Sequence, residues 1–215
     1  MDVEPELLNG LWNQETRRDV TTNGLLLNLP AEKCAARATA RAPKLAPLCG
    51  DIQRRKARDE GAGALSIDLA VRFTDLASGQ VLVDSRDAAG RGYALRTTED
   101  GTIRFEMSDG WQAAYWDCDA GLLKTNSLHH LVVIVDGRAK VICVVVDGVL
   151  NDGGAQRQFG FGRFNPTFKD VSGGRDLQIA PALHGELGPL RVYDRALRTS
   201  EAVGNFHALG PRLGL

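Results

Sequence analysis

The sequence lacks long hydrophobic runs and has no surplus of charge of either sign. No stretch approaches the roughly 18 consecutive apolar residues of a membrane-spanning helix, and the opening MDVEPE has neither the basic start nor the apolar run of a signal peptide. Its 26 basic and 27 acidic residues give a formal net charge of −1, which provides no general attraction to nucleic acid or to a membrane surface. We therefore expect no nucleic-acid partner and no membrane insertion. An extracellular or periplasmic location is expected only if the chain is part of a secreted parent protein.

Cysteines are few and lack the spacing of a metal or redox motif. None of the four belongs to a C-x-x-C pair, which argues against a structural zinc site and a thioredoxin-like motif. Cys143 lies in an apolar run, where we expect a small buried side chain. Cys34 and Cys49 enclose fourteen residues of an irregular region and would close a loop in an oxidising compartment. The sequence leaves their redox state open.

Proline is also scarce, with 8 residues against 24 glycines. This balance is typical of many short strands joined by tight turns rather than of a helical bundle. A chain of 215 residues with 43% hydrophobic content can bury a core as one unit, because all-β sandwiches commonly run to about 200 to 250 residues. We expect a single domain over residues 1–215.

The strongest local signal is the segment from Ser127 to Asp152, SLHHLVVIVDGRAKVICVVVDGVLND. Two runs rich in Val and Ile, residues 131–136 and 140–147, are separated by the turn pair Asp136-Gly137, which is typical of a β-hairpin. Both faces of the second run are apolar. We therefore expect it in the middle of a sheet that is covered on both sides.

Alternating apolar residues and turn residues predict further strands. Residues 65–73 place apolar side chains at every second position, so one face is expected to meet the core and the other to face solvent or a binding surface. Shorter strands are expected at 25–29, 81–84, 93–97, 102–107, 177–180 and 185–194. A short helix is expected to begin near Thr199 or Ser200 and to end at Gly210-Pro211. This pattern indicates a sandwich of antiparallel strands.

Two segments are less regular. Residues 31–63 are interpreted as an irregular basic insertion, in which residues 31–40 favour a short helix. Residues 33–58 carry eight basic side chains and one acid. Such a run is either a docking patch for an anionic polymer or a solvated insertion on the surface of the sandwich. We favour solvation because no aromatic residues are interleaved. Residues 153–175 are expected to form a long loop that its phenylalanines anchor to the core.

Several motifs, in their order and spacing, resemble the laminin G-like or concanavalin A-like domains of modular bacterial proteins. The closing segment, GELGPLRVYDRALRTSEAVGNFHA, contains a strand, an Arg-Ala-Leu and a Ser/Thr-x-Glu as that family does. The central hairpin is similar to the family's Trp-His-x-Val…Asp-Gly…Val-Asp-Gly run, with Leu128 where tryptophan is common. The resemblance covers roughly residues 64–209 well and residues 11–29 more loosely.

This resemblance implies an all-β jelly-roll sandwich of two antiparallel sheets with a short C-terminal helix. Domains of this kind mostly bind glycans or proteins, often with a calcium ion held by an early Asp-x-Ser-Gly-Asn turn and a later acid. Asp19 and Asn23 partly match the first element, but Gly188-Pro189 stands where the acid is expected. Since calcium needs about six to eight oxygen ligands, the missing acid weakens this possible site.

A cluster of aromatic and acidic residues forms the candidate glycan site. Aromatic faces stack on sugar rings and carboxylates bond their hydroxyls. Alternation places Tyr115 and Trp116 on opposite faces of a strand, so at most one of them is expected in the core. The candidate ligand-binding residues are Trp111, Tyr115, Trp116, Asp117 and Asp119.

Signals for catalysis are weak. The chain has no Glu-x-Asp-x-Glu strand, and the spacing of Glu106 and Asp109 puts these acids on opposite faces. His184 and Tyr193 leave open a lyase-like pair, and the two histidines of the central hairpin are interpreted as structural. We therefore predict a non-catalytic recognition module for a glycan or polysaccharide. A protein-binding or adhesion module is the alternative, and a polysaccharide-cleaving enzyme comes third.

Overall fold

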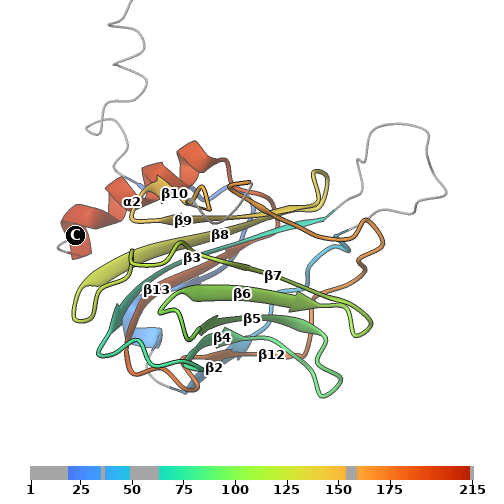
Figure 1. The fold of residues 1–215 in the computed structure, drawn as a ribbon, viewed down its shortest axis with the longest axis horizontal. Coiled ribbons are helices and arrows are strands. Elements are labelled where there is room, and N and C mark those ends of the chain that lie inside the picture. The colour runs from blue at the N-terminus through green and yellow to red at the C-terminus, as the bar shows by residue number, and fades with distance from the viewer. Residues whose placement is uncertain (1–18, 35–36, 49–62, 154–158, 214–215) are drawn as a thin grey trace, which may run out of the picture.

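The computed structural model describes residues 19–34, 37–48, 63–153 and 159–213. Two antiparallel sheets lie face to face, and helix α2 (Thr199–Leu213) packs on the outer face of one of them (Figure 1). The predicted all-β sandwich with a C-terminal helix is confirmed. No helix in these ranges combines the length and the hydropathy that crossing a membrane requires.

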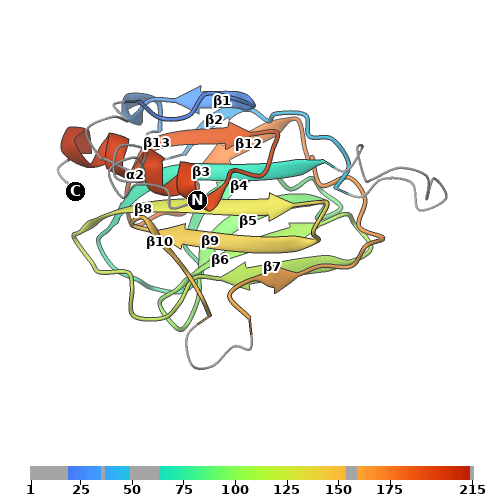
Figure 2. The same cartoon turned by 90° about the horizontal axis from the view of Figure 1, so that it is seen from above.

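Each sheet combines a run of consecutive strands, β8–β10 in the first and β4–β7 in the second, with strands that are far apart in the sequence (Figure 2). The first sheet, in spatial order, contains β1 (Leu25–Leu29), β13 (Gly185–Tyr193), β3 (Ala64–Phe73), β8 (Leu128–Asp136), β9 (Val141–Val146) and β10 (Val149–Leu150), with β11 (Gly162–Arg163) also beside β9. The second sheet contains β2 (Ala38–Arg41), β12 (Asp176–Ile179), β4 (Val81–Asp84), β5 (Gly92–Thr97), β6 (Ile103–Ser108) and β7 (Ala113–Asp117). The strand predicted at residues 25–29 forms and pairs with β13, which is distant in the sequence.

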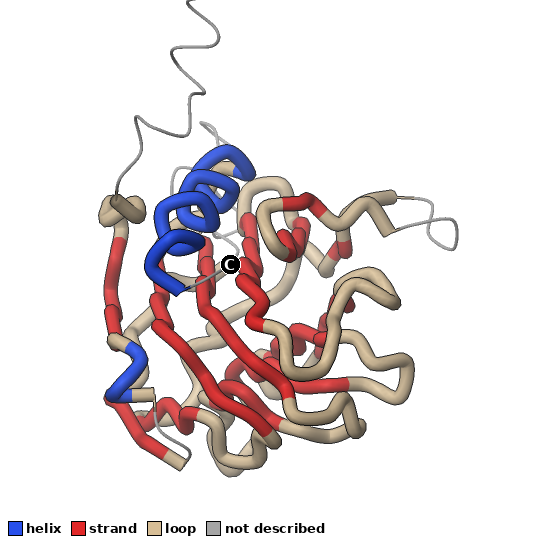
Figure 3. Tube along the Cα trace, turned by 90° about the vertical axis from the view of Figure 1, so that its left-hand side faces the viewer, coloured by secondary structure: helices blue, strands red, loops and turns tan. Residues whose placement is uncertain are grey.

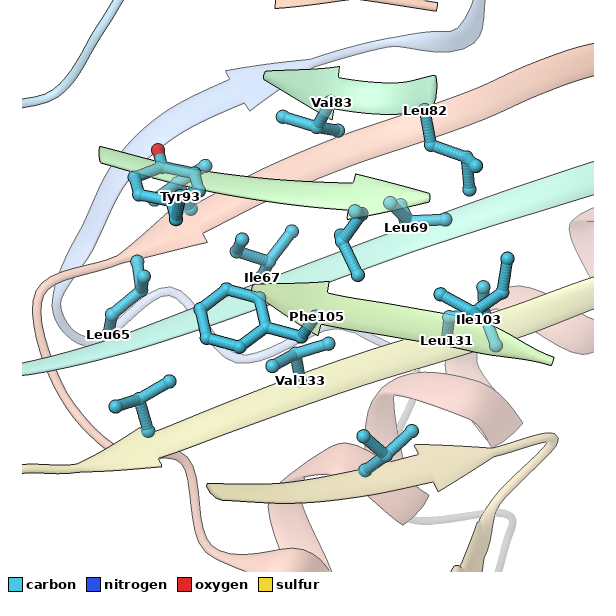
Figure 4. Close-up of a cluster of buried hydrophobic side chains, with 14 of the residues drawn as sticks. Leu65, Ile67, Leu69, Leu82, Val83, Tyr93, Ile103, Phe105, Leu131 and Val133 are labelled. Carbon is cyan, nitrogen blue, oxygen red and sulfur yellow. The ribbon is translucent and has the colours of Figure 1, made fainter. Parts of the chain in front are cut away.

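The core fills the space between the two sheets (Figure 4). Leu65, Ile67 and Leu69 of β3 point toward Tyr93 and Phe105 of the second sheet, and all five side chains are almost fully buried. Alternation along the strands produces this arrangement, because every second side chain of each strand faces the opposite sheet. The remaining side chains of each sheet point outward. In the first sheet they face helix α2 or solvent, and in the second sheet they face solvent.

The predicted hairpin forms in the first sheet, where β8 pairs antiparallel with β9, and the two-residue strands β10 and β11 lie beyond β9. Its inner side chains join the main core, while Val132, Ile134 and Val145 pack in a second cluster with residues of the α2 region. The expectation of cover on both faces is confirmed for β8 and for Val145 of β9, whereas Val141 and Cys143 on the outer face of β9 are only partly buried. Cys143, on the outer face, is only partly buried, so the prediction of a buried thiol was too strong.

Helix α2 corrects two predictions. It continues through Gly210-Pro211 to Leu213, so these two residues do not end it as predicted. Together with the loop before it, the helix also covers part of β3, whose second face was expected to be open: Asn205 contacts Asp68, and residues 195–197 contact Ser66. Ser66 and Asp68 on that face have no exposed surface. Figure 3 shows the helix lying against the outside of the strands.

Beneath α2 lies a buried polar group of four residues, Asp68, His130, Arg191 and Asn205, here called the Asp68 cluster. One carboxylate oxygen of Asp68 accepts a hydrogen bond from Arg191 (3.1 Å) and lies 3.2 Å from His130 Nε2. The other accepts from Asn205 of the helix (2.7 Å). Asn205 Oδ1 in turn accepts from the backbone N–H of Thr21 (2.8 Å). The cluster thereby links strands β3, β8 and β13 to helix α2 and to the segment before β1.

The segment after β1 differs from the predicted helix. A single 3-10 turn, η2 (Ala31–Lys33), precedes strand β2. Although alanine favours helices, Ala38 and Ala40 pack on the core, and β2 pairs with β12 over its whole length. Tertiary pairing therefore outweighs local helix propensity. Burial raises the pKa of the Cys34 thiol to about 11. Cys49 and residues 49–62, which include part of the basic run, lie outside the described residues.

The long loop after β10 is anchored by two of its four phenylalanines. Phe164 and Phe168 are buried with their rings 5.7 Å apart, edge to face. Phe159 is 46% exposed. The predicted anchoring is thus confirmed for the second half of the loop, while residues 154–158 lie outside the described residues.

Candidate functional site

The outer face of the second sheet carries its side chains in rows, because neighbouring strands are in register. One row contributes a residue from each of the six strands and is here called the central row. It consists of Thr39, Gln178, Asp84, Ala94, Glu106 and Tyr115. On one side of it lies the arginine row, Arg96, Arg104 and Asp117. On the other side lies the small-residue row, Gly92, Ser108 and Ala113.

The small-residue row forms part of the lining of a pocket of about 180 Å³. Three adjacent strands place a glycine, a serine and an alanine side by side, so no large side chain fills the space above them. Tyr115 and Glu106 of the central row also line the pocket, and Arg86 from the loop after β4 completes this part of its wall. The pocket is smaller than the roughly 300 to 1,000 Å³ of drug-sized ligand sites. It has room for one small ring.

Gly92 is required at its position in this row. Its φ of 137° is rarely adopted by residues with a side chain, and a Cβ there would lie 2.8 Å from the Cα of Arg86. The glycine therefore lets the loop after β4 approach the start of β5, and this close approach brings Arg86 to the edge of the pocket.

Tyr115 is the aromatic wall of the pocket and is 60% exposed. The guanidinium of Arg104 lies over its ring, 4.4 Å from the centroid. Arg104 is itself held by Asp117 through two hydrogen bonds of 2.7 and 2.8 Å, which raise the pKa of Arg104. Because Arg104 belongs to the arginine row and the pocket lies on the other side, one ring face is covered and the other is left for a ligand.

Polar groups of the pocket are already ordered by one another. Glu106 accepts a hydrogen bond from Arg96 (2.5 Å), and Arg86 lies 3.7 Å from its other oxygen. The side chain of Arg86 also donates to both carboxylate oxygens of Asp84. Ser108 Oγ accepts from the backbone of Gly110 (3.1 Å). Such fixed donors and acceptors can bind hydroxyl groups without reordering.

Trp111 lies at the tip of the β6–β7 turn and is 89% exposed. Buried Asp109 shapes this turn, since one of its oxygens accepts from the N–H groups of Trp111 and Gln112 (both 3.0 Å). Its other oxygen accepts from the backbone of Lys169 (2.9 Å). Burial would raise the pKa of Asp109, but these hydrogen bonds outweigh it and lower the pKa. The turn therefore presents a large aromatic ring to solvent at the end of the β6–β7 hairpin.

The five residues of the predicted glycan site divide between two sides of strand β7. Tyr115 is exposed and lines the pocket, and Asp117 supports it through Arg104. Trp111 is exposed at the turn before the strand. Trp116 packs against the main core, so the predicted opposition of Tyr115 and Trp116 is confirmed. Asp119 follows the strand, and its backbone N–H donates to Asn151 Oδ1 (2.9 Å). The pocket brings together Tyr115 with residues that were not predicted.

Replacing Trp116 with alanine is expected to destabilise the fold. Its ring packs on the core and against Gly162, where an added Cβ would lie 2.9 Å from the ring. Loss of a core tryptophan costs about 3 kcal/mol or more. Thermal unfolding should show a melting temperature lowered by several degrees. Glycan binding by the folded fraction should be retained, and loss of binding with unchanged stability would contradict this assignment.

The turn that contains Asn23 is organised around a guanidinium group. Arg195 donates to the carbonyl of Asn23 (2.7 Å) and pairs with Glu201 through hydrogen bonds of 2.7 and 2.8 Å. It also lies 3.4 Å from Thr21 Oγ1. A calcium ion at these oxygens would be repelled by this positive charge, so the residues described there do not fit the ion. Calcium binding through Asp19 and Asn23 stays an untested prediction.

The described residues do not form the catalytic pairs that were considered. His184 and Tyr193 lie at opposite ends of β13, which puts them roughly 25 Å apart for a strand of this length. Asp109 is engaged by the turn, away from Glu106. The histidines of the hairpin have structural partners: His129 lies 2.7 Å from Asp147, and His130 belongs to the Asp68 cluster. The structural interpretation of both histidines agrees with these contacts.

The pocket was missed by sequence reasoning because its parts are small and dispersed. Gly92, Ser108 and Ala113 come from three strands, and nothing in the sequence pairs them. A usable signal did exist in β6, where Arg104, Glu106 and Ser108 alternate with Ile103, Phe105 and Met107. That alternation already indicates a polar outer face at the centre of a sheet.

Comparison with known families gives one match that spans most of the chain. The family model described as the concanavalin A-like lectin/glucanases superfamily matches residues 53–202. No curated protein matches the sequence.

Solved structures with a similar fold share little sequence with this chain. The CBM40 domain of the IT-sialidase of Ruminococcus gnavus, bound to α2,3-sialyllactose, has 16% identity and a TM-score of 0.52, covering 77% of this chain and 95% of its own. A leech intramolecular trans-sialidase has 18% identity and a TM-score of 0.54, covering 86% and 28%. A structure of botulinum neurotoxin type C, whose cell entry depends upon interaction with two ganglioside molecules, has 11% identity and a TM-score of 0.56, covering 87% and 51%. These similarities concern the fold.

Proposed function

Because the chain belongs to the concanavalin A-like lectin/glucanases superfamily, we propose that it is a non-catalytic carbohydrate-binding module whose site is the pocket on the outer face of the second sheet. The observation that carries the proposal is the pocket beside Tyr115, whose exposed ring is held by Arg104. A sugar ring stacked on Tyr115 would place its hydroxyls near Glu106, Ser108 and Arg86. This combination of one aromatic face and a few placed polar groups suits sugar recognition.

The fold neighbours support this proposal without identifying the ligand. The Ruminococcus gnavus domain is a structure bound to sialyllactose, and the botulinum neurotoxin structure is described by an interaction with gangliosides. Sialyllactose is a glycan, and gangliosides are glycolipids that carry one. The support for binding in this chain comes from its own pocket, because similarity at such low identity concerns the fold alone.

Trp111 extends the proposed site beyond the pocket. Ser108 and Ala113 line the pocket and pair with each other across the hairpin whose tip carries Trp111. A glycan with one unit beside Tyr115 can therefore place a neighbouring unit on the exposed indole. We propose that an oligosaccharide contacts both aromatic rings.

A glycan array with the purified protein, with calcium or with a chelator, tests the proposed function. We expect binding in both conditions, since Arg195 supplies the positive charge where a calcium ion was predicted. The variant Ala113→Phe should lower the array signal at least tenfold, because a bulky side chain on this row would fill the pocket. Ala113 is exposed, so the fold should tolerate the change.

The control variant Ala113→Ser keeps a small side chain in the same row and should bind like the original protein. Thermal unfolding of both variants checks that they fold equally well. Undiminished binding by Ala113→Phe would contradict the assignment of the pocket. Binding that disappears with the chelator would instead support the predicted calcium site.

A further inference from the structure

We propose that the pocket selects uncharged sugar rings and discriminates against sugars that carry a carboxylate. This inference rests on the proposed function and names the ligand class of the same site. It is drawn from the charges that line and border the pocket.

Charges at the pocket wall cancel. Arg86 and Glu106 are the charged residues among those that line it, and they lie 3.7 Å apart. Arg86 is further engaged by Asp84, with contacts of 3.0, 3.1 and 2.5 Å from its Nε and Nη2 atoms. This hydrogen bonding raises the pKa of Arg86 and keeps its charge directed at a carboxylate of the protein.

The bordering arginines are paired in the same way. Arg96 donates to Glu106 (2.5 Å), and Arg104 donates to Asp117. Arg91, in the loop that also contributes to the pocket, lies 3.0 Å from Asp87. Around the described pocket each of these guanidinium groups therefore already has an acidic partner.

A carboxylated sugar would meet an unfavourable environment here. Its carboxylate would lie close to Glu106, and to bind the Nε and Nη2 donors of Arg86 it would have to displace Asp84. Breaking such a pair leaves the displaced carboxylate without its partner. The specificity is therefore produced by repulsion as much as by attraction.

An uncharged ring has no such conflict. Glu106 accepts hydrogen bonds from sugar hydroxyls while keeping its contact with Arg96. The hydroxyl of Ser108 can donate, since its oxygen accepts from Gly110 (3.1 Å). Tyr115 offers its open face to the ring. These groups are complementary to hydroxyls and C–H bonds rather than to an anion.

Matched pairs of glycans test the inference with the chain of 215 residues. Each pair contains a neutral member and its acidic counterpart, such as lactose with 3′-sialyllactose, or a cello-oligosaccharide with the corresponding glucuronide. Binding is measured at physiological ionic strength. We expect the neutral member of a bound pair to bind at least tenfold more tightly.

The variant Glu106→Gln should reduce the ratio of affinities for the neutral and acidic members of a pair at least fivefold. It removes the carboxylate that repels the acidic member and releases Arg86 and Arg96 from one partner. Asp176→Asn is the control. It removes an exposed carboxylate from the outer face of β12, outside the pocket, and should leave the ratio within each pair unchanged. Thermal unfolding confirms that both variants fold.

The outcomes separate the two proposals. Tighter binding of acidic members by the original protein would overturn the selectivity while leaving the glycan-binding function in place. An unchanged ratio in Glu106→Gln would likewise overturn the role of this carboxylate. Absence of binding to every pair would overturn the proposed function and, with it, this inference.

Discussion

Replacing Tyr115 with alanine is expected to abolish detectable glycan binding while leaving the fold intact. The ring is the aromatic wall of the pocket and is 60% exposed. Removing a central aromatic contact typically costs about 2 kcal/mol or more of binding free energy, which corresponds to roughly 30-fold or more in affinity. Stability should change by less than about 1 kcal/mol, since the loss is limited to an exposed side chain and its contact with Arg104. Calorimetric titration with a glycan that the array identifies measures the effect.

The variant Tyr115→Phe provides the matched control. It keeps the ring, and with it the stacking face and the contact with Arg104, and should retain most of the affinity. If Tyr115→Ala binds as tightly as the original protein, the site lies elsewhere. Loss of binding in both variants would indicate that the phenolic hydroxyl, rather than the ring face, makes the decisive contact.

Replacing Asp68 with alanine is expected to cause the largest loss of stability. The change leaves buried Arg191 and His130 without their shared carboxylate and removes the acceptor for Asn205 of helix α2. Breaking a buried ion pair by removing one partner costs about 3 to 5 kcal/mol. For a chain of this size the melting temperature should fall by roughly 6 to 20 °C. Thermal and denaturant unfolding measure the loss.

Glu186→Ala is the matched control for that experiment. Its partner Arg72 is 3.8 Å away and both side chains are largely exposed, so this variant should lose less than about 1 kcal/mol. A loss of similar size in both variants would mean that the Asp68 cluster has no special role.

The contribution of Asp68 should also depend on pH. Burial would raise its pKa, but the hydrogen bonds from His130 and Asn205 and the charge of Arg191 outweigh it, and the pKa lies below its ordinary value of 3.8. A carboxyl whose pKa is lowered by folding stabilises the protein above its unfolded value and loses that contribution as the pH falls through the folded value. The stability gap between the original protein and Asp68→Ala should therefore narrow only below about pH 4. A gap that closes near pH 7 would indicate a different titrating group.

Much of the fold could be predicted because strand signals are local. Alternation and Asp-Gly pairs located the central hairpin and most strands, and the order of motifs indicated the sandwich. The misread segment, residues 31–40, shows the limit. Its alanines favour a helix in isolation, and only pairing with β12, which is more than a hundred residues away in the sequence, makes Ala38–Arg41 a strand.

The covered face of β3 could not be predicted for a related reason. Ser66 and Asp68 have the polarity of solvent-facing residues, and their burial depends on helix α2 and the loop before it, which the sequence alone does not place. The same applies to the pocket. Aromatic Trp111 and Tyr115 were visible as candidates, whereas the small-residue row exists only once the register of β5, β6 and β7 is known.

That register gives the second sheet a property useful for engineering. Along β6, Ile103, Phe105 and Met107 hold the strand in place from within, and a slip by one residue would bury Arg104 and Glu106 instead. The outward positions are not needed for this anchoring. A combinatorial library that varies Ser108, Ala113 and Tyr115 could therefore be screened for new ligands on an unaltered scaffold, in the way that antibody loops are diversified on a constant framework.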